Sequence, residues 1–468
     1  MTDPQVIFEK FEPRSAWQAY YPLGSNPWDL RKVGHLYRRA AFGGSWKSLQ
    51  SGLNSSPTQL VEQLLQGGSG QREFERVSEE QLDIVMRSQD PRQLKAWWIY
   101  RMLHSPHPLK ERMTLFWHNH FATSNAKVDN LWLMQRQHDS LRKHALGNFG
   151  ELLQEMTRDP AMILWLDSNT NKKGRPNENY AREIFELFSL GVGNYTEDDI
   201  QQAARALTGW DVRDGRAVFN PADFDTGRKT IFGRTGNWAA GDVVRIILEQ
   251  PACSRFLTRK LIREFVGETI TVSNEMLEPL ASQFRIRNYD IAWLVEQILK
   301  SWVFYSDAAI LQKVKSPVDF LAGTVRMLEG QVGPEMLADL CDELGQSLFY
   351  PPSVKGWDGS DDWINSTTLL SRQNIARKLT SGESEARGCD PATLVSRHRV
   401  QDDEAVVEFF LQLFLQNPAH DSRTKILDFA RSERRRLRAM LYSSEIINQR
   451  VARSIAHLVL TLPEFQLA

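Results

Sequence analysis

The sequence TEDDIQQAARALTGWDVRDGRAVF, residues 196–219, decides the fold class because it contains both kinds of local structure that the chain offers. Thr196 is placed as a helix N-cap, and the three acidic residues after it favour the positive end of a helix dipole. Gly209 ends the helical pattern. β-forming residues then flank Asp214 and Gly215, a pair typical of the turn in a β-hairpin. The stretch therefore predicts a helix followed by a small β-hairpin.

Helical patterns continue on both sides of this hairpin. Upstream, DPRQLKAWWIYRMLHS places Asp90 as an N-cap and Pro91 at the first helical position. Downstream, helices resume at AGDVVRIILEQ and continue to the end of the chain. We predict a mainly α fold, a multi-helical single large domain with a β-hairpin and loop insertion near residues 210–236. Residues 1–27 are expected to form an N-terminal extension, residues 28–468 the helical domain, and residues 381–393 a surface loop.

Composition narrows the class of protein. Hydrophobic residues at 41% and charged residues at 25% are typical of a soluble globular protein. A net charge of −1 provides no basic field for nucleic acid. No apolar run approaches the length of a membrane span, and no secretory signal is readable at the start. The three cysteines are far apart and match neither a disulfide framework nor a zinc site. The default location is therefore the cytoplasm, and export with a signalled partner stays open.

The most polar segment is PNENYAREIFE, residues 176–186. Three polar side chains lie in its first turn, where one would suffice as a cap. Arg182 stands four residues from both Glu178 and Glu186 and is expected to neutralise one buried carboxylate, leaving another in surplus. The segment is interpreted either as a structural ion-pair helix or as the wall of a polar cleft. The candidate acid–base residues are Glu178 and Glu183, and the candidate ligand-binding residues are Asn177, Asn179 and Arg182.

The sequence FWHNHF, residues 116–121, suggests a metal site because paired histidines are common ligands. On a helix, however, His118 and His120 point roughly 200° apart. His118 is the candidate catalytic partner of the glutamates, whereas His120 and Glu178 are candidate metal ligands. The alternative for His120 is an imidazole at the edge of the core. Trp357, in a loop rich in Pro and Gly, is a candidate for ligand binding.

Several long blocks carry a family resemblance. They include MTLFWHNHFATS, NFGELLQEMTRDPAMILWLDSNTN, PNENYAREIFELFSLGVGNYTEDDI, KSPVDF and GQSLFYPPSVKGW. With them the chain resembles the bacterial domain-of-unknown-function family 1800 from about Trp28 to its end. The resemblance implies a helical fold and frequent gene pairing with the domain-of-unknown-function family 1501, which looks like the sulfatase and alkaline-phosphatase superfamily. One departure is Phe224 before Asp225, where family members commonly carry histidine.

Two functions remain open at this level. The first is an enzyme whose polar cleft is walled by the Asn177–Glu186 helix and is active through a metal or through acid–base chemistry. The alternative is a non-catalytic partner or maturation factor for a sulfatase- or phosphatase-like protein. The cofactor is unknown, with a divalent metal as one candidate, and whether the chain is an enzyme stays undecided.

Overall fold

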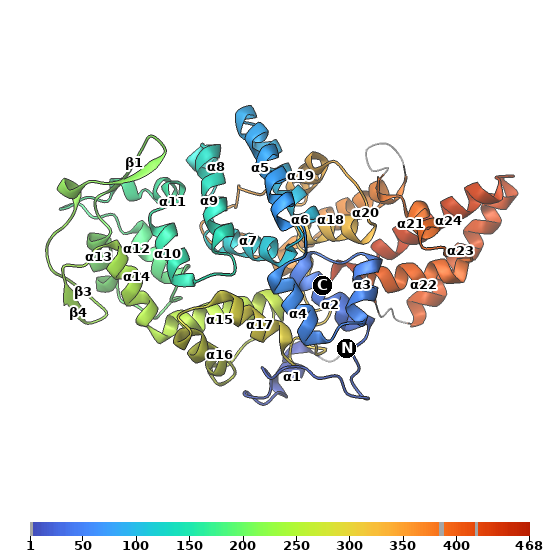
Figure 1. Ribbon diagram of the computed structural model, residues 1–468, viewed down its shortest axis with the longest axis horizontal. Helices are drawn as coiled ribbons and strands as arrows, with labels where there is room; N and C mark the ends of the chain where they lie inside the picture. The colour runs from blue at the N-terminus through green and yellow to red at the C-terminus, as the bar shows by residue number, and fades with distance from the viewer. Residues whose placement is uncertain (1–2, 383–387, 417–419) are drawn as a thin grey trace.

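Proline and polar caps set the beginning of most helices in this chain. Pro91 stands at the start of α6, and the Asp90 carboxylate accepts a hydrogen bond from the Arg92 amide at 2.9 Å, as the sequence predicts. The computed structural model describes residues 3–382, 388–416 and 420–468. Figure 1 shows these residues as an elongated assembly of helices with a small amount of β-structure at one end. The mainly α fold is thus confirmed.

The middle of the molecule is formed by helices from two separate parts of the sequence (Figure 1). The first part contains α1 (Pro4–Glu9), α2 (Leu30–Ala41), α3 (Trp46–Leu53), α4 (Pro57–Gln66), α5 (Gln71–Ser88), α6 (Pro91–His104) and α7 (Pro108–His120). The second part contains α15 (Pro251–Phe265), α16 (Asn274–Ile286), α17 (Ile291–Lys300), α18 (Pro317–Met327) and α19 (Pro334–Glu343). Helix α19 packs on α6, and α17 packs on α4. The middle therefore depends on contacts between distant segments.

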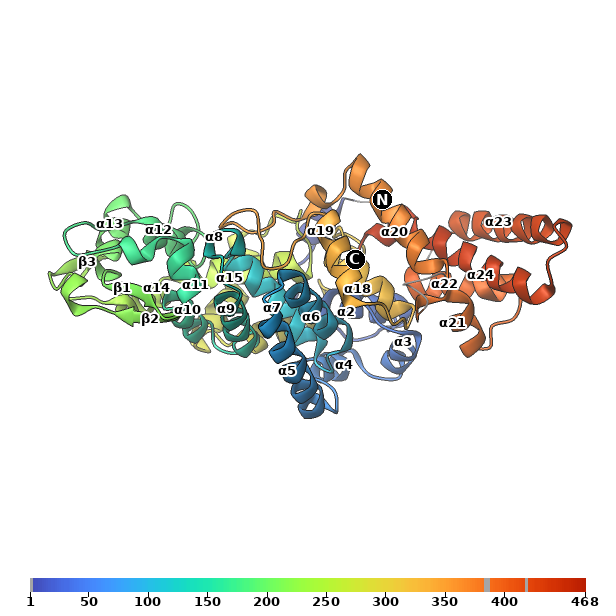
Figure 2. The same cartoon turned by 90° about the horizontal axis from the view of Figure 1, so that it is seen from above.

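The end coloured green in Figure 1 holds the next helices and all the strands of the described residues. Its helices are α8 (Asn125–Val128), α9 (Leu131–Lys143), α10 (Phe149–Thr157), α11 (Pro160–Trp165), α12 (Asn179–Glu186), α13 (Glu197–Ala206) and α14 (Ala240–Glu249). The opposite end, orange and red, holds α20 (Ser366–Thr380), α21 (Pro391–Arg397), α22 (Asp403–Phe414), α23 (His420–Ala439) and α24 (Ser444–Leu460). Figure 2 shows the same elongated arrangement from above.

Two antiparallel hairpins make up the β-sheet structure of the described residues. Strands β1 (Trp210–Arg213) and β2 (Arg216–Phe219) form the predicted hairpin. Asp214 and Gly215 have φ angles of 49° and 69°, and a two-residue type I′ turn requires both to be positive. Strands β3 (Lys229–Ile231) and β4 (Arg234–Gly236) form a second hairpin in a stretch that we expected to be loop. Its turn places Phe232 at a φ of 48°. Phenylalanine rarely adopts this left-handed conformation, so the sequence does not predict the turn.

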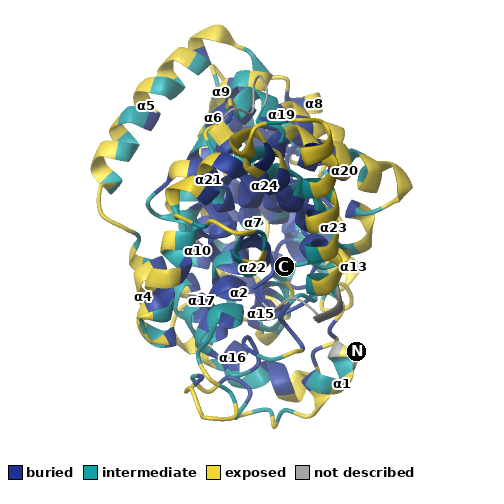
Figure 3. Ribbon diagram, turned by 90° about the vertical axis from the view of Figure 1, so that its right-hand side faces the viewer, coloured by how far each residue is buried: buried dark blue, intermediate teal, exposed yellow. Residues whose placement is uncertain are grey.

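One continuous hydrophobic core runs through the molecule, and Figure 3 shows buried helices in the middle of the view with exposed faces on α5 and α23. The segment expected as an N-terminal extension contributes Phe8, Trp17 and Tyr20 to this core. The Trp17 indole N–H donates a hydrogen bond to the carbonyl of Met276 at 2.7 Å. Within the described ranges, no helix is both long and apolar enough to cross a bilayer.

The segment predicted as a surface loop, residues 381–393, is described only in part. Residues 383–387 lie outside the described residues. The remainder ends in ordered structure, because the Cys389 side chain is fully buried and α21 begins at Pro391.

Candidate functional site

The two histidines of FWHNHF lie near the end of α7 and face different surroundings, as helical spacing predicts. His118 is buried beside the rings of Trp98, Phe349 and Trp357. Its Nε2 accepts a hydrogen bond from the backbone N–H of Phe349 at 3.2 Å. Burial lowers the pKa of His118 to about 3, so the ring is neutral at physiological pH. His118 therefore acts in the packing of α7 against the loop after α19.

His120 is held in one tautomer by its two partners. Its Nε2 lies 3.0 Å from the carbonyl of Phe188, to which it donates. Its Nδ1 is then free to accept a hydrogen bond from the Lys260 amine, also at 3.0 Å. Burial, and secondly the Lys260 charge, hold the pKa of His120 well below its ordinary value. The imidazole is thus a neutral acceptor aimed at an amine.

Lys260 lies on α15 and reaches His120 across 140 positions of sequence. Its amine also donates to the carbonyl of Leu187 at 3.3 Å, just beyond the last residue of α12. Burial, and secondly the neighbouring Arg263 charge, lower the pKa of Lys260 to about 8. A lysine with such a pKa carries an unprotonated fraction of about a tenth at pH 7. Helices α7 and α15 and the residues after α12 thus bring together a partly unprotonated amine and a neutral imidazole.

A pocket of about 240 Å³ opens beside this pair. Its wall combines the end of α7, the later part of α15 and the loop that carries Trp357. The lining residues are Phe116, Asn119, His120, Lys260, Arg263, Glu264, Glu268, Lys355, Trp357 and Asp358. A neighbouring hollow of about 90 Å³ shares six of these residues, and we call the two hollows together the groove.

The Trp357 loop is fastened to α7 by Asn119. The Asn119 side chain accepts a hydrogen bond from the Trp357 amide at 2.7 Å and donates one to the Trp357 carbonyl at 3.3 Å. Gly356 has a φ of 83°, and a Cβ at this position would lie 2.1 Å from the Asn119 Oδ1. Only glycine fits this close approach, which fixes one wall of the pocket.

The charges of the groove are distributed unevenly. Glu264 and Glu268 are both paired with Lys313, at 2.6 and 3.2 Å. In the described part of the chain, by contrast, neither Arg263 nor Lys355 takes part in an ion pair, although both line the pocket. Among the described residues Asp358 has no ion pair either, so the pocket holds the unpaired charges of two cations and one carboxylate beside the Lys260 amine.

The first turn of the predicted polar segment is occupied by local hydrogen bonds. The Asn177 side chain donates to Thr170 at 2.8 Å and accepts from the backbone N–H of Asn179 at 3.0 Å. The backbone N–H of Asn177 in turn donates to the buried Asn171 side chain at 2.9 Å. These contacts tie the start of α12 to the preceding turn. Glu178 precedes the helix and lies about one-third exposed at its surface.

The opposite end of α12 approaches the pocket. Leu187 and Phe188 supply the carbonyls that hold Lys260 and His120. Burial, and secondly the Glu186 carboxylate, raise the pKa of Glu183, while the charge of Lys355 at the pocket mouth acts in the other direction. Of the predicted site residues, the structure thus brings together His120 and Trp357, with Glu183 at the border. Residues 177–179 lie outside the pocket lining.

Arg182 differs from the expectation of a buried ion pair. Its side chain is 37% exposed and binds Glu197 at 2.8 Å, with Glu178 more distant at 3.6 Å. Exposed pairs of this kind contribute little because water and salt screen them. Arg182→Ala should therefore lower the free energy of unfolding by less than about 1 kcal/mol. Urea denaturation measures this change in the free energy of unfolding. A loss several times larger would contradict the prediction, because the ion pairs of Arg182 would then not be screened by water.

Metal binding was the other chemistry suggested by the histidines. Among the described residues, no group of three or more His, Cys, Asp or Glu side chains is placed to hold a metal ion. His120 uses both ring nitrogens in the contacts above, and Glu178 lies at the surface near Arg182. These contacts therefore do not bring the two candidate metal ligands, His120 and Glu178, together in one metal site.

The departure at Phe224 lies in a separate polar loop. Its ring is covered by the Lys229 amine, 4.6 Å from the ring centre. Asp225 binds Arg205 at 2.8 Å, and this hydrogen bond holds the pKa of Asp225 below its ordinary value. These contacts fasten the loop to α13 and give Asp225 a structural partner.

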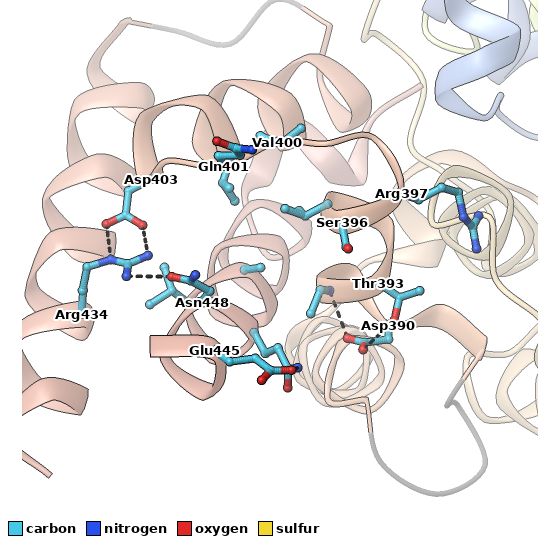
Figure 4. A pocket seen from close by; sticks show the side chains of 16 residues that line it. Asp390, Thr393, Ser396, Arg397, Val400, Gln401, Asp403, Arg434, Glu445 and Asn448 are labelled. Carbon is cyan, nitrogen blue, oxygen red and sulfur yellow. Dashed lines mark hydrogen bonds and ion pairs between the residues drawn. The ribbon is translucent and has the colours of Figure 1, made fainter. Parts of the chain in front are cut away.

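A larger groove of about 790 Å³ lies at the other end of the molecule, among α21, α22, α23 and α24 (Figure 4). The polar side chains around it are largely paired: Arg434 binds both Asp403 and Asn448, and Asp390 binds Thr393. Among the residues that the structure describes, no histidine, cysteine or lysine lines this groove. The groove is therefore large, but its described lining contains none of these three reactive types of side chain.

Sequence reasoning missed Lys260 and Arg263. The available signal was weak: Lys260 and Glu264 stand four residues apart, which places them on one face of a helix. That spacing is common on solvated surfaces, and nothing local indicates that the amine meets a histidine from α7.

Comparison with known proteins adds one finding. No curated protein and no solved structure matches the chain. A family model, described as a protein of unknown function, matches residues 35–467, which include every residue of the pocket. The chain therefore belongs to the DUF1800 family.

Proposed function

We propose that the pocket at the end of α7 is an acid–base active site that acts on a small anionic compound. The observation that carries the proposal is the hydrogen bond of 3.0 Å between the Lys260 amine and the His120 Nδ1 inside this pocket. Lys260 is the proposed general base, because its lowered pKa keeps part of the amine free near neutral pH.

The neighbouring groups support this role for Lys260. When the amine takes a proton from a substrate, the new ammonium donates to the His120 Nδ1 and to the Leu187 carbonyl, which already lie within reach. His120 is thus a positioning residue that keeps the amine aimed at the pocket. Arg263 and Lys355 would bind the anionic group of the substrate at the mouth.

Two of the predicted residues take defined places in this proposal. Trp357 supplies an apolar wall on which a substrate can pack. Glu183 would orient Lys355, because the two charges interact at the border of the pocket. Glu178 is not needed for the proposed chemistry.

The decisive measurement is the reactivity of the Lys260 amine as a function of pH. The protein is acylated briefly with acetic anhydride across a pH series, and each lysine is quantified by peptide mass spectrometry. Half-maximal labelling of Lys260 is expected near pH 8. Half-maximal labelling near the ordinary value for a lysine, about 10.4, or no labelling of Lys260 at any pH, would refute the proposal.

A cellular assay separates catalysis from a partner role. In a host that depends on the gene, Lys260→Met should abolish function while the matched Lys143→Met supports it. The alternative function is that of a partner or maturation factor for a sulfatase- or phosphatase-like protein. It predicts that Lys260→Met still supports function, because a group inside a small pocket does not form a protein interface.

A further inference from the structure

The turn between α23 and α24 projects further than its surroundings. Figures 1 and 2 both show this turn at one end of the longest axis of the molecule. We call residues 431–450 the basic tip. Two apolar residues of its turn are exposed: Leu441 is 93% exposed and Met440 is 54% exposed. Ile446 in the same segment is 40% exposed, so the basic tip presents three large apolar side chains to solvent rather than one alone.

The backbone makes the exposed leucine more significant. Leu441 has a φ of 60°, in the left-handed region that glycine adopts more readily than any branched residue. The neighbouring Leu437 is fully buried, so the helix before the turn is firmly packed. The packed helix therefore holds the leucine outward at the expense of local strain.

Positive charge surrounds these apolar residues. The basic tip contains six arginines and two glutamates, whereas the whole chain has a net charge of −1. Arg431, Arg435 and Arg438 follow a spacing of four and three along α23, which places them on one exposed face. Within residues 3–382, 388–416 and 420–468, Arg435 and Arg438 form no ion pair. Their charges are available to an external anion.

We propose that the basic tip docks the protein on an anionic lipid surface. Arginines near the headgroup phosphates gain electrostatic attraction, and the apolar turn enters the boundary between headgroups and acyl chains. The basic tip is convex, and a lipid surface can receive it without a preformed pocket. An acidic protein would match the charge but would also need a preformed apolar recess for Leu441 and Met440, whereas the boundary between headgroups and acyl chains accepts apolar side chains without one.

The proposal is independent of the Lys260 site, because the basic tip lies at the end of the molecule opposite the β-hairpins and shares no residue with the pocket. Docking by this end would leave the pocket mouth free. The two proposals can therefore fail separately.

Sedimentation with lipid vesicles tests the proposal on the full chain. The protein should bind vesicles of phosphatidylcholine mixed with phosphatidylglycerol but not vesicles of phosphatidylcholine alone, and binding should weaken as salt rises. The double variant R435E and R438E should reduce the partition coefficient by more than tenfold, since each arginine contributes about fivefold near an anionic surface. Leu441→Ser should weaken binding several-fold without changing the salt dependence.

The matched control is R72E with R87E on α5, because both arginines are exposed and lie on another solvated helix. This variant carries the same change in net charge and should bind as the wild type does. Equal losses in the two double variants would overturn the proposal, since binding would then follow overall charge. Unchanged binding of Leu441→Ser, together with equally tight binding to polyglutamate, would assign the basic tip to an acidic protein and also overturn it.

Discussion

Glu111→Ala should lower the free energy of unfolding by about 3–5 kcal/mol, because it removes the fully buried one of the two carboxylates that compensate the buried Arg101 guanidinium. Glu111 is completely buried, and its Oε1 accepts hydrogen bonds from Arg101 at 3.0 Å and Arg142 at 2.9 Å. Burial alone would raise the pKa of Glu111, but the two guanidinium groups outweigh it and lower the pKa to about 2. The carboxylate is therefore ionised and compensates charges on α6 and α9 together.

Denaturation by urea, followed by circular dichroism, measures this loss. Glu111→Gln should be less damaging than Glu111→Ala, since an amide oxygen still accepts a hydrogen bond from one arginine. The matched control is Glu73→Ala on α5, which removes an exposed carboxylate paired with Arg76 at 2.6 Å. Its unfolding midpoint should equal that of the wild type. Equal stability of Glu111→Ala and the wild type would mean that the remaining Glu75 compensates Arg101 fully.

The fold was predictable where a single segment determines its own conformation. Asp214 and Gly215 define a hairpin locally, because both adopt positive φ angles that this pair tolerates. The Asp90 cap and Pro91 mark a helix start for the same reason. The second hairpin was not predictable, because its turn is held by tertiary contacts such as the hydrogen bond of 2.7 Å that the Phe232 backbone N–H donates to the Asp199 carboxylate on α13.

The candidate site was predictable only in part, for a related reason. His120 attracted notice through its neighbours in FWHNHF, and Trp357 through the turn residues around it. Lys260 has no such local mark, and its meaning depends on a histidine in another helix. The start of α12 shows the reverse case, since Asn177 looks like a ligand residue in sequence yet its hydrogen bonds hold a turn together. Polar density alone does not distinguish a site from a well-satisfied turn.

Acid should destabilise the protein well before its carboxylates are protonated. Among the described residues, four histidines are less than 5% exposed, and burial lowers the pKa of each; they are His35, His118, His120 and His138. In the unfolded chain each would titrate near 6.5. Because the folded pKa values are lower than the unfolded value, their contribution to stability is present above pH 6.5 and is lost as the pH falls below it.

The expected slope follows from the protons taken up on unfolding. Each histidine contributes about 1.4 kcal/mol per pH unit below its unfolded pKa. Asp159 acts in the opposite direction, since burial raises its pKa to about 7 and the folded state then holds one extra proton between about pH 7 and 4. His35, His118 and His120, whose pKa values are lowered furthest, set a net uptake of about two protons against Asp159, which corresponds to roughly 3 kcal/mol per pH unit below pH 6. Such a slope removes the stability of a typical domain, about 5–15 kcal/mol, within a few pH units.

Urea denaturation at a series of pH values between 8 and 5 measures this slope directly. His118→Gln provides the matched variant, because the glutamine oxygen can accept the hydrogen bond from the Phe349 amide that Nε2 accepts in the wild type. The variant should lose about 1.4 kcal/mol of the slope per pH unit, whatever its stability at pH 8. A free energy of unfolding that stays constant from pH 8 to pH 5 would show that the buried rings take up protons in the folded state. That result would contradict the low pKa of His118, and therefore its neutral and packed state. The interior around α7 would then be hydrated.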